Sequence, residues 1–267
     1  MIYWFSGTGN SRFVASELGK ALGQELQFIP STSASRQTPD SKGMGFVFPV
    51  YSWGVPPVVL DFIAGLPDSF AAEQLYTWAA MTCGDEVAKT PEMLARALRR
   101  KGIKLNACWS VIMPNNYVLL PGFDVDSAEL AEQKLRAVPA RIEVIASEIR
   151  QKTERFDVTR GSSPRLKSMV WHLFKRWGVF PSKWKVNDKC VDCGRCSTVC
   201  PVGNIKMEAG HPVWGKDCIS CVACYHACKL QAIEYGKFTR GKGRYFFPDF
   251  VSSIRKGASR NEKLHNI

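Results

Sequence analysis

The stretch CVDCGRCSTVCP, residues 190–201, is followed by CISCVACYHACK, residues 218–229, and the two together decide the fold of the C-terminal part. In both stretches the four cysteines have the spacing Cys-x2-Cys-x2-Cys-x3-Cys, and the second copy lies 28 residues after the first. The repeat extends beyond the cysteines, because Ile205 and Ile233 occupy equivalent positions. Three thiolates from one short loop can surround a corner of a metal cluster, while a distant fourth thiolate connects two loops.

Three other uses of closely spaced cysteines fit this pattern less well. Zinc modules use CxxC pairs in closed tetrahedral sites, and a further cysteine three residues on does not suit such a site. Disulfide frameworks belong to small secreted chains, and we expect no secretory signal here, since residues 1–5 lack leading basic residues and have the pattern of a strand. Redox CxxC pairs occur singly. The spacing therefore favours iron–sulfur clusters.

The spacing resembles that of bacterial two-cluster ferredoxins, in which the fourth cysteine of each run binds the other cluster. The resemblance implies one [4Fe–4S] cluster on Cys190, Cys193, Cys196 and Cys228, and a second on Cys218, Cys221, Cys224 and Cys200. One departure is Lys229, which stands where Pro201 follows the first run. Since all ligands are supplied, we expect His226 to be a surface residue.

The first half of the chain alternates between strand and helix patterns, which predicts a parallel sheet covered by helices on both faces. In such sheets the ligand binds at the carboxyl ends of the strands, so the loops that follow the strands are the candidate site. We expect strands over 1–6, 44–50, 75–82 and 107–113, and helices over 10–22, from about 56 and over 88–100.

The first of these loops has a composition that favours a phosphate group. It consists of Ser6, Gly7, Thr8, Gly9, Asn10 and Ser11, and its amides and hydroxyls would meet at a helix N-terminus. No Gly-Lys-Ser/Thr follows, and Arg12 replaces the third glycine of the dinucleotide fingerprint. The alternative is an ordinary turn in which Asn10 caps the helix.

This loop resembles the phosphate loop of flavodoxins, which bind FMN. The resemblance implies a doubly wound parallel sheet of strand order 2-1-3-4-5, joined to a C-terminal α+β ferredoxin-like domain with two clusters. It also implies that two further loops enclose the flavin ring. Those loops contain Pro49, Val50, Tyr51, Ser52, Trp53 and Gly54, and Thr82, Cys83, Gly84 and Asp85.

Tyr51 and Trp53 could stack on that ring, and Gly84 would permit close backbone approach. Alternatively, the two aromatic residues cap the edge of the sheet. Cys108 lies in an apolar strand and is expected in the core, and Cys83 is read as a plain small residue. A single phosphate loop without a dinucleotide fingerprint favours FMN over FAD.

The loop over 113–123 also follows a strand, and its polar residues Asn115, Asn116 and Tyr117 have three open roles. They line the rim of a pocket, contact the second domain, or belong to a bare loop. Residue Asp126 is expected to cap a long helix that runs to about Lys152, with a kink at Pro139. Its expected buried side consists of Leu130, Val138, Ile142, Ile145 and Ile149.

We expect an FMN-binding domain over 1–155, a basic amphipathic connection over 156–188, a ferredoxin domain over 189–240 and a basic surface tail over 241–267. The connection contains apolar residues at helical spacing, and we expect this stripe to be buried between the domains. An anionic membrane surface is the alternative. The stripe consists of Leu166, Met169, Val170, Leu173, Phe174 and Trp177.

The composition of the 267 residues, 45% hydrophobic and 22% charged, is that of a folded protein. The formal net charge of +12 falls to about +6 once two clusters and a flavin phosphate are bound. A basic surface favours an acidic redox protein or partner oxidoreductase. No groove-reading motif for nucleic acid accompanies the basic clusters. No apolar run reaches the roughly 18 residues of a membrane span, and we expect a cytoplasmic protein.

A chain that holds both cofactors is expected to relay electrons, because clusters carry single electrons and a flavin carries one or two. We therefore expect an electron-transfer protein that serves a partner redox enzyme, with no catalytic acid–base residues assigned. Two alternatives stay open. One is a flavin-dependent reductase of a small substrate, in which Asn115, Tyr117 or Trp53 shapes the pocket. The other is an iron–sulfur redox sensor.

Overall fold

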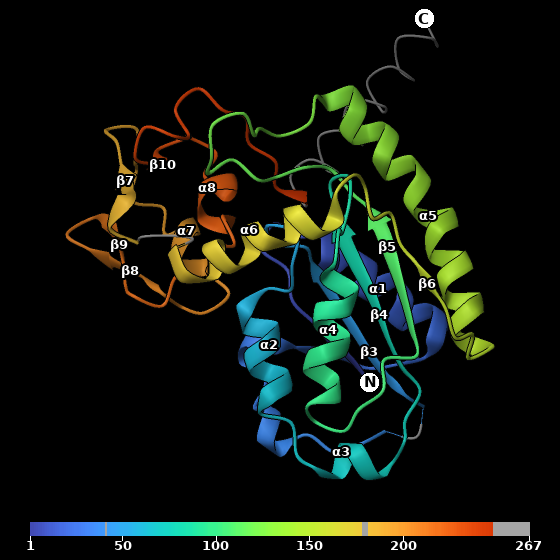
Figure 1. Ribbon diagram of the computed structural model, residues 1–267. Coiled ribbons are helices and arrows are strands. Elements are labelled where there is room, and N and C mark those ends of the chain that lie inside the picture. The colour runs from blue at the N-terminus through green and yellow to red at the C-terminus, as the bar shows by residue number, and fades with distance from the viewer. Residues whose placement is uncertain (41, 178–180, 248–267) are drawn as a thin grey trace, which may run out of the picture.

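The computed structural model describes residues 1–40, 42–177 and 181–247, and its larger part is a parallel six-stranded sheet (Figure 1). The strand order is β2-β1-β3-β4-β5-β6, and all neighbouring pairs are parallel. Every residue of β4 is buried, as expected for a central strand with helices on both sides. The strands are β1 (Ile2–Trp4), β2 (Leu26–Phe28), β3 (Met44–Pro49), β4 (Thr77–Cys83), β5 (Ala107–Ile112) and β6 (Phe156–Asp157).

Helices cover both faces of this sheet, which confirms the predicted mixed α/β class and its parallel sheet. Helices α1 (Asn10–Leu22) and α5 (Ala128–Arg150) pack on one face, and α2 (Pro57–Ala64) and α4 (Thr90–Arg99) on the other. No residue range was predicted for β2 and β6, which have three and two residues. Three short helical segments complete this part: η1 (Ile29–Ser31), η2 (Ala34–Arg36) and α3 (Ser69–Ala72).

Helix α5 differs from its prediction in two details. Its N-cap is Ser127, whose side chain accepts a hydrogen bond from the Leu130 amide, because Asp126 is engaged elsewhere. Leu130 is 42% exposed, because Ala131 faces the sheet at this turn and is 1% exposed. The remaining predicted positions, Val138, Ile142, Ile145 and Ile149, are buried.

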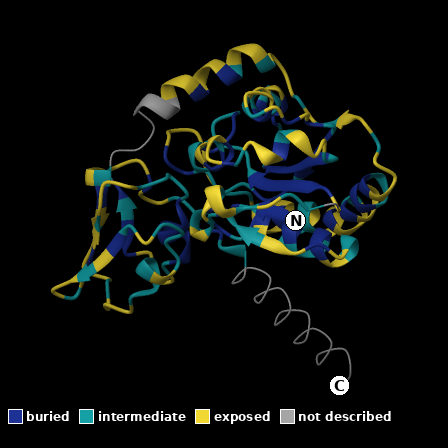
Figure 2. Ribbon diagram, turned by 90° about the horizontal axis from the view of Figure 1, so that it is seen from below, coloured by how far each residue is buried: buried dark blue, intermediate teal, exposed yellow. Residues whose placement is uncertain are grey.

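The cysteine repeat forms a smaller unit of two antiparallel strand pairs. Strand β7 (Trp184–Val186) pairs with β10 (Ile233–Tyr235), and β8 (Ile205–Glu208) pairs with β9 (His211–Trp214). Ile205 and Ile233, equivalent in the repeat, are both buried in its core. Much of its surface is exposed or half-buried, in contrast to the sheet (Figure 2). Its other elements are η3 (Pro181–Lys183), α7 (Arg195–Thr198) and α8 (Ala223–Ala227).

After β10 the chain returns to the larger part, so the first residues of the basic tail predicted from residue 241 pack against the sheet. Tyr245 is buried, and its hydroxyl lies 2.9 Å from Asn10 Oδ1. The Phe247 amide donates to the Thr8 carbonyl at 2.9 Å, and the Phe247 ring packs on Phe13. The chain order does not reveal this contact, because 235 residues separate Tyr245 from Asn10. Residues 248–267 of the predicted tail lie outside the described residues.

Helix α6 (Pro164–Trp177) connects the two parts across the end of the sheet (Figure 1). It packs through Ser168 and Trp171, which are 7% and 5% exposed. The predicted burial of its apolar stripe is wrong for all four members whose side chains are described, because the packing face lies beside the stripe. The exposed members are Leu166, Met169, Val170 and Leu173. The side chains of Phe174 and Trp177 lie outside the description.

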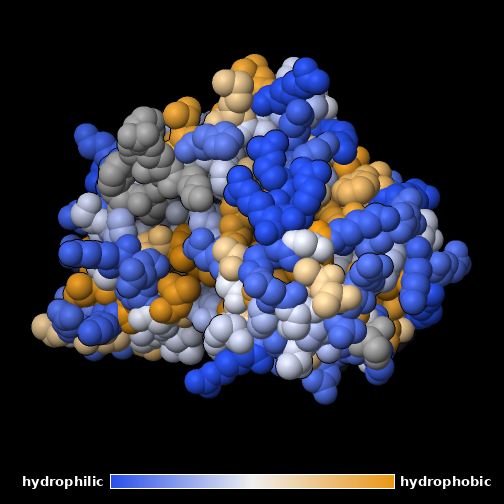
Figure 3. Space-filling model, turned by 60° about the horizontal axis from the view of Figure 1, so that its bottom comes forward, coloured by the Kyte–Doolittle hydropathy of each residue, from blue (hydrophilic) through white to orange (hydrophobic). Residues whose placement is uncertain are grey.

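The view in Figure 3 shows a mainly hydrophilic face on which hydrophobic groups are scattered. Among the described residues, no helix combines the length and the apolar character that a transmembrane helix requires.

Candidate functional site

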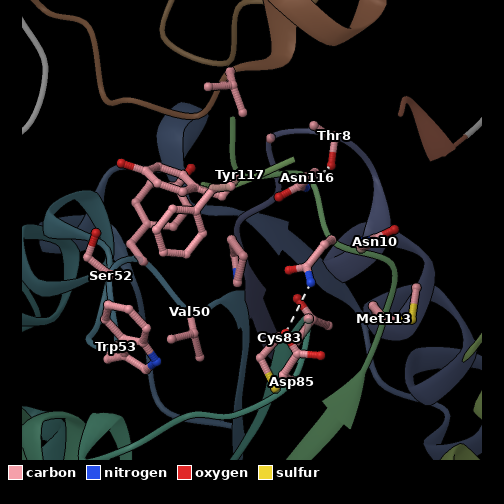
Figure 4. A pocket seen from close by; sticks show the side chains of 18 of the residues that line it. Thr8, Asn10, Val50, Ser52, Trp53, Cys83, Asp85, Met113, Asn116 and Tyr117 are labelled. Atoms are coloured by element: carbon pink, nitrogen blue, oxygen red, sulfur yellow. Dashed lines mark hydrogen bonds between the residues drawn. The ribbon is translucent and has the colours of Figure 1, made fainter. Parts of the chain in front are cut away.

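A pocket of about 590 Å³ opens at the carboxyl edge of the sheet, within the range of small-molecule sites. All the predicted residues of the three loops line it except Gly9 and Gly54. Thr8 and Asn116 lie at one end, and Ser52 and Trp53 lie at the other (Figure 4). The pocket therefore has a hydroxyl- and amide-bearing end and an aromatic end.

The loop before α1 has a backbone suited to an anion. Gly9 adopts a left-handed conformation with φ 107°, and no side chain caps the N-terminus of α1. The first amides of a helix need an acceptor, and here none is supplied by a capping side chain. Two hydroxyls of the loop have partners of their own: Ser6 Oγ accepts a hydrogen bond from the Gly9 amide at 3.1 Å, and Ser11 Oγ lies 2.7 Å from Thr82 Oγ1 on β4.

The second loop is a tight turn in which Ser52 and Trp53 have positive φ values of 44° and 60°. Non-glycine residues occupy this region at a cost, so the surrounding structure must hold the turn. Tyr51 and Gly54 exchange two backbone hydrogen bonds, and the Trp53 indole donates to Glu86 at 2.8 Å. The turn thereby places Trp53 at the wall of the pocket.

Gly54 serves helix α6 rather than the pocket. A Cβ atom at this position would lie 2.2 Å from Cδ1 of Trp171, so only glycine admits the indole ring. The Trp171 indole donates to the Val55 carbonyl at 2.8 Å, and Ser168 donates to the Trp53 carbonyl at 2.9 Å. Helix α6 is thus fixed onto the turn, and its Lys167 and Val170 contribute to the pocket wall.

The loop over 113–123 forms a further wall of the pocket. Of the three roles considered for its polar residues, they have two: they line the pocket, and Asn116 contacts the cysteine repeat. Asn115, Asn116 and Tyr117 all line the pocket. The Asn115 side chain is held by Asp85 and its backbone amide by Asp126, at 3.1 and 2.9 Å. A Cβ at Gly84 would lie 1.8 Å from Asn115 Oδ1, so Gly84 admits this side chain.

Asn116 also connects the pocket to the cysteine repeat, because its carbonyl is hydrogen-bonded to His226. His226, predicted at the surface, is 3% exposed. Its Nδ1 accepts the Tyr245 amide at 3.1 Å, so Nε2 carries the proton and donates to the Asn116 carbonyl at 2.7 Å. Burial lowers the pKa of His226 to about 4 and keeps the ring neutral. Its neighbours in space, not its place between two cysteines, explain the burial.

Cys83 and Cys108, the two cysteines outside the repeat, are both buried. Burial raises the pKa of Cys83, which lines the pocket, to about 12, and likewise raises the pKa of Cys108. Such thiols are protonated and unreactive. Cys108 packs in the core, as predicted.

Seven of the eight cysteines of the repeat lie in two groups, and each group includes the last cysteine of the other run. Burial raises the pKa of Cys196, and the nearby thiols of Cys228 and Cys190 raise it further. The second group lines a small cavity and consists of Cys200, Cys218, Cys221 and Cys224. Cys200 therefore lies with the second run and Cys228 with the first.

The backbone of the two runs is shaped alike. Asp192 and Ser220, at equivalent positions, have φ values of 53° and 62°, and Gly194 and Val222 have 67° and 52°. Left-handed residues curl a loop so that its amides face inward, as loops around clusters require. Two amide-to-sulfur contacts also repeat, each 3.2 Å: Asn204 to Cys200 Sγ and Ala232 to Cys228 Sγ. In the described part of the chain no group of three His, Cys, Asp or Glu side chains is arranged to hold a single metal ion. The donors fit two four-iron clusters.

The second group of cysteines adjoins the large pocket. Ser220, Cys221 and Val222 belong to the pocket wall. A Cβ at Gly7 would lie 2.4 Å from the Cys221 carbonyl oxygen, so the two loops touch. Burial raises the pKa of Tyr51 well above its usual value, and the nearby Cys221 and Cys218 add to this shift. Tyr51 thus lies between the pocket and this group of cysteines.

Residues 137–243 match a family described as the 4Fe-4S dicluster domain. A search of curated proteins finds pyruvate synthase subunit PorD of Methanothermobacter marburgensis, 35% identical over 74 residues, which cover 28% of this chain and 80% of that protein. Among solved structures, the Trp repressor binding protein from Bacillus subtilis aligns with a TM-score of 0.37 and 16% identity, over 56% of this chain and 96% of that one.

Proposed function

The chain belongs to the 4Fe-4S dicluster family, and from this premise we propose that it relays electrons between two [4Fe–4S] clusters and one FMN for a partner redox enzyme. The observation that carries the proposal is the shared wall of the large pocket, to which both the Ser6–Ser11 loop and Cys221 contribute. Residues 1–155 would form a flavodoxin-like domain, 156–188 the connection and 189–240 the ferredoxin domain.

In this proposal Cys200, Cys218, Cys221 and Cys224 hold the inner cluster, beside the large pocket. The outer cluster is held by Cys190, Cys193, Cys196 and Cys228. When bound, the clusters supply one-electron transfer, and the flavin supplies one- or two-electron transfer. The chain's own residues position these groups. The uncapped start of α1 would receive the phosphate, and Trp53 and Tyr117 would enclose the ring.

The proposed partner is an acidic redox protein or an oxidoreductase of the pyruvate synthase type. The similarity to a pyruvate synthase subunit supports an enzyme of that type. The net charge of +12 on this chain supports a partner with an acidic contact surface, because complementary charge accelerates the encounter between redox partners.

The test is anaerobic purification followed by iron, sulfide and flavin analysis and a redox titration. We expect about eight irons per chain together with one FMN. The variant Thr8→Glu should lose FMN and keep its iron, because a carboxylate at the phosphate end repels the ligand. The control Ser35→Glu adds the same charge at an exposed position and should keep both. Full iron without flavin in the unmodified protein would refute the FMN assignment.

A second candidate function is a flavin-dependent reductase, favoured by the third wall of the pocket. Asn115, Tyr117 and Phe123 enlarge the site beyond the three loops predicted for the flavin. A purified protein that turns over a small electron acceptor with reduced ferredoxin, without any partner enzyme, would favour this function. The relay predicts electron transfer only when the partner enzyme is added.

A further inference from the structure

Two tryptophans stand at the cavity of the inner cysteine group. Trp184 on β7 and Trp214 on β9 line it together with Cys200, Cys218 and Cys224. Their rings are stacked, with centroids 6.0 Å apart and planes inclined by 16°. Trp184 is 4% exposed and also packs edge-on against Tyr235. Both rings are therefore held in place by packing.

The indole N–H groups of these tryptophans are buried without a hydrogen-bond partner among the described residues. A buried donor without an acceptor costs free energy, so such a group calls for an explanation. Both indoles line the same cavity as Cys218 and Cys224, whose sulfur atoms can accept hydrogen bonds.

The internal repeat offers a comparison within the same chain. The amide-to-sulfur contacts occur in both halves, at Asn204 and Ala232. The tryptophans do not repeat. The 28-residue offset relates Trp184 to Pro212 and Trp214 to Val186, neither of which carries a side-chain donor. The indole donors therefore distinguish one half of the repeat from the other.

We propose that Trp184 and Trp214 donate hydrogen bonds to the sulfur atoms of the inner cluster and raise its reduction potential. Reduction adds negative charge to a cluster, and N–H dipoles aimed at its sulfurs stabilise that charge. The cluster beside the pocket would then retain an electron better than it would with hydrocarbon side chains around it. This inference rests on the proposed function only in that it requires clusters on these cysteines.

The test replaces the indoles by phenyl rings, which keep an aromatic side chain but lack the donor. Trp184→Phe, Trp214→Phe and the double variant would be titrated anaerobically and followed by electron paramagnetic resonance. We expect one of the two cluster potentials to become more negative while the other stays constant. In the double variant the equilibrium for reducing that cluster should fall at least tenfold, which is 59 mV for a one-electron couple. The control Trp4→Phe removes an indole from the sheet domain and should change neither potential.

A second measurement needs no substitution. Pulsed electron–nuclear double resonance of the reduced protein should find proton couplings at one cluster that disappear in heavy water, and indole N–H groups are among their sources. The single variants should each remove part of this signal. Unchanged potentials in variants that retain about eight irons would overturn the proposal. Equal shifts of both clusters, or no loss of the exchangeable couplings, would overturn it as well.

This experiment can refute the role of the tryptophans and the electron relay independently, because the cluster potentials can be measured in protein that carries no flavin. A flavin-free preparation in which the double variant still shifts one cluster would refute the relay and support the role of the tryptophans. An FMN-containing preparation with no shift would do the reverse.

Discussion

The contact between Gly7 and Cys221 makes the substitution Gly7→Ala the sharpest test of how the two parts work together. The new methyl group would lie 2.4 Å from the Cys221 carbonyl oxygen and 3.0 Å from Cys221 Cβ. Ordinary contact between such atoms begins near 3.5 Å, so one loop must move by about 1 Å. Gly7 is not among the residues with positive φ, so the effect of alanine would come from this contact alone.

Overpacking of this kind destabilises a protein by about 1–3 kcal/mol. At about 2–4 °C per kcal/mol for a protein of this size, the melting temperature should fall by several degrees. Under the proposed relay the variant should retain iron and FMN, because neither proposed set of ligands is removed. Electron exchange between the proposed inner cluster and flavin should slow, because the widened contact separates their sites. Stopped-flow absorbance after rapid reduction of the clusters measures that rate.

The matched control is Gly65→Ala, at a glycine with φ −84° whose added Cβ would lie 3.1 Å from Ala34 Cβ in the sheet domain. It tests whether a tight methyl far from the cysteines changes electron exchange, and we expect no change. If Gly7→Ala matched the unmodified protein in both stability and exchange rate, the shared wall would not be the route between the two sites.

Three further results are expected. Cys228→Ser should remove the outer cluster, because Cys228 lies with Cys196. Iron analysis should then find about four irons instead of about eight, and electron paramagnetic resonance should show one cluster. Trp171→Ala should cost about 3–5 kcal/mol in local stability and raise hydrogen exchange in α6, since Trp171 is 5% exposed. The hydrogen bond from Arg141 lowers the pKa of Asp157, so its stabilisation is present above the carboxyl's ordinary pKa and is lost as pH falls through the lowered value. As the pH is lowered below about 4, the melting temperature of Asp157→Asn should therefore fall less than that of the unmodified protein.

Local signals in the sequence predicted much of this molecule. Helix α1 begins at Asn10 and ends at Leu22, as its pattern indicated, because its apolar spacing and the flanking glycines act over a few residues. The parallel sheet followed from the alternation of strands and helices. The edge strands β2 and β6 were missed because two or three residues carry too little pattern to identify a strand.

Most residues that line the pocket lie in the loops singled out from the sequence, since the loops after parallel strands converge at one edge of the sheet. The pocket contributions of Lys167, Val170 and Ser220 were not, because these residues come from elements that reach the edge only after the chain has folded. His226 illustrates the limit: its burial depends on Asn116 and Tyr245, neither of which is a close neighbour in the chain.

The spacing of eight cysteines by itself identified the metal-binding region, because ligation within one short loop depends on distances along the chain. Two features followed from how β7, β9 and the Gly7 loop pack in space: which cysteine group borders the large pocket, and which indoles line the small cavity of that group. Contacts between segments hundreds of residues apart leave no periodic trace in the chain, so only the folded molecule shows them.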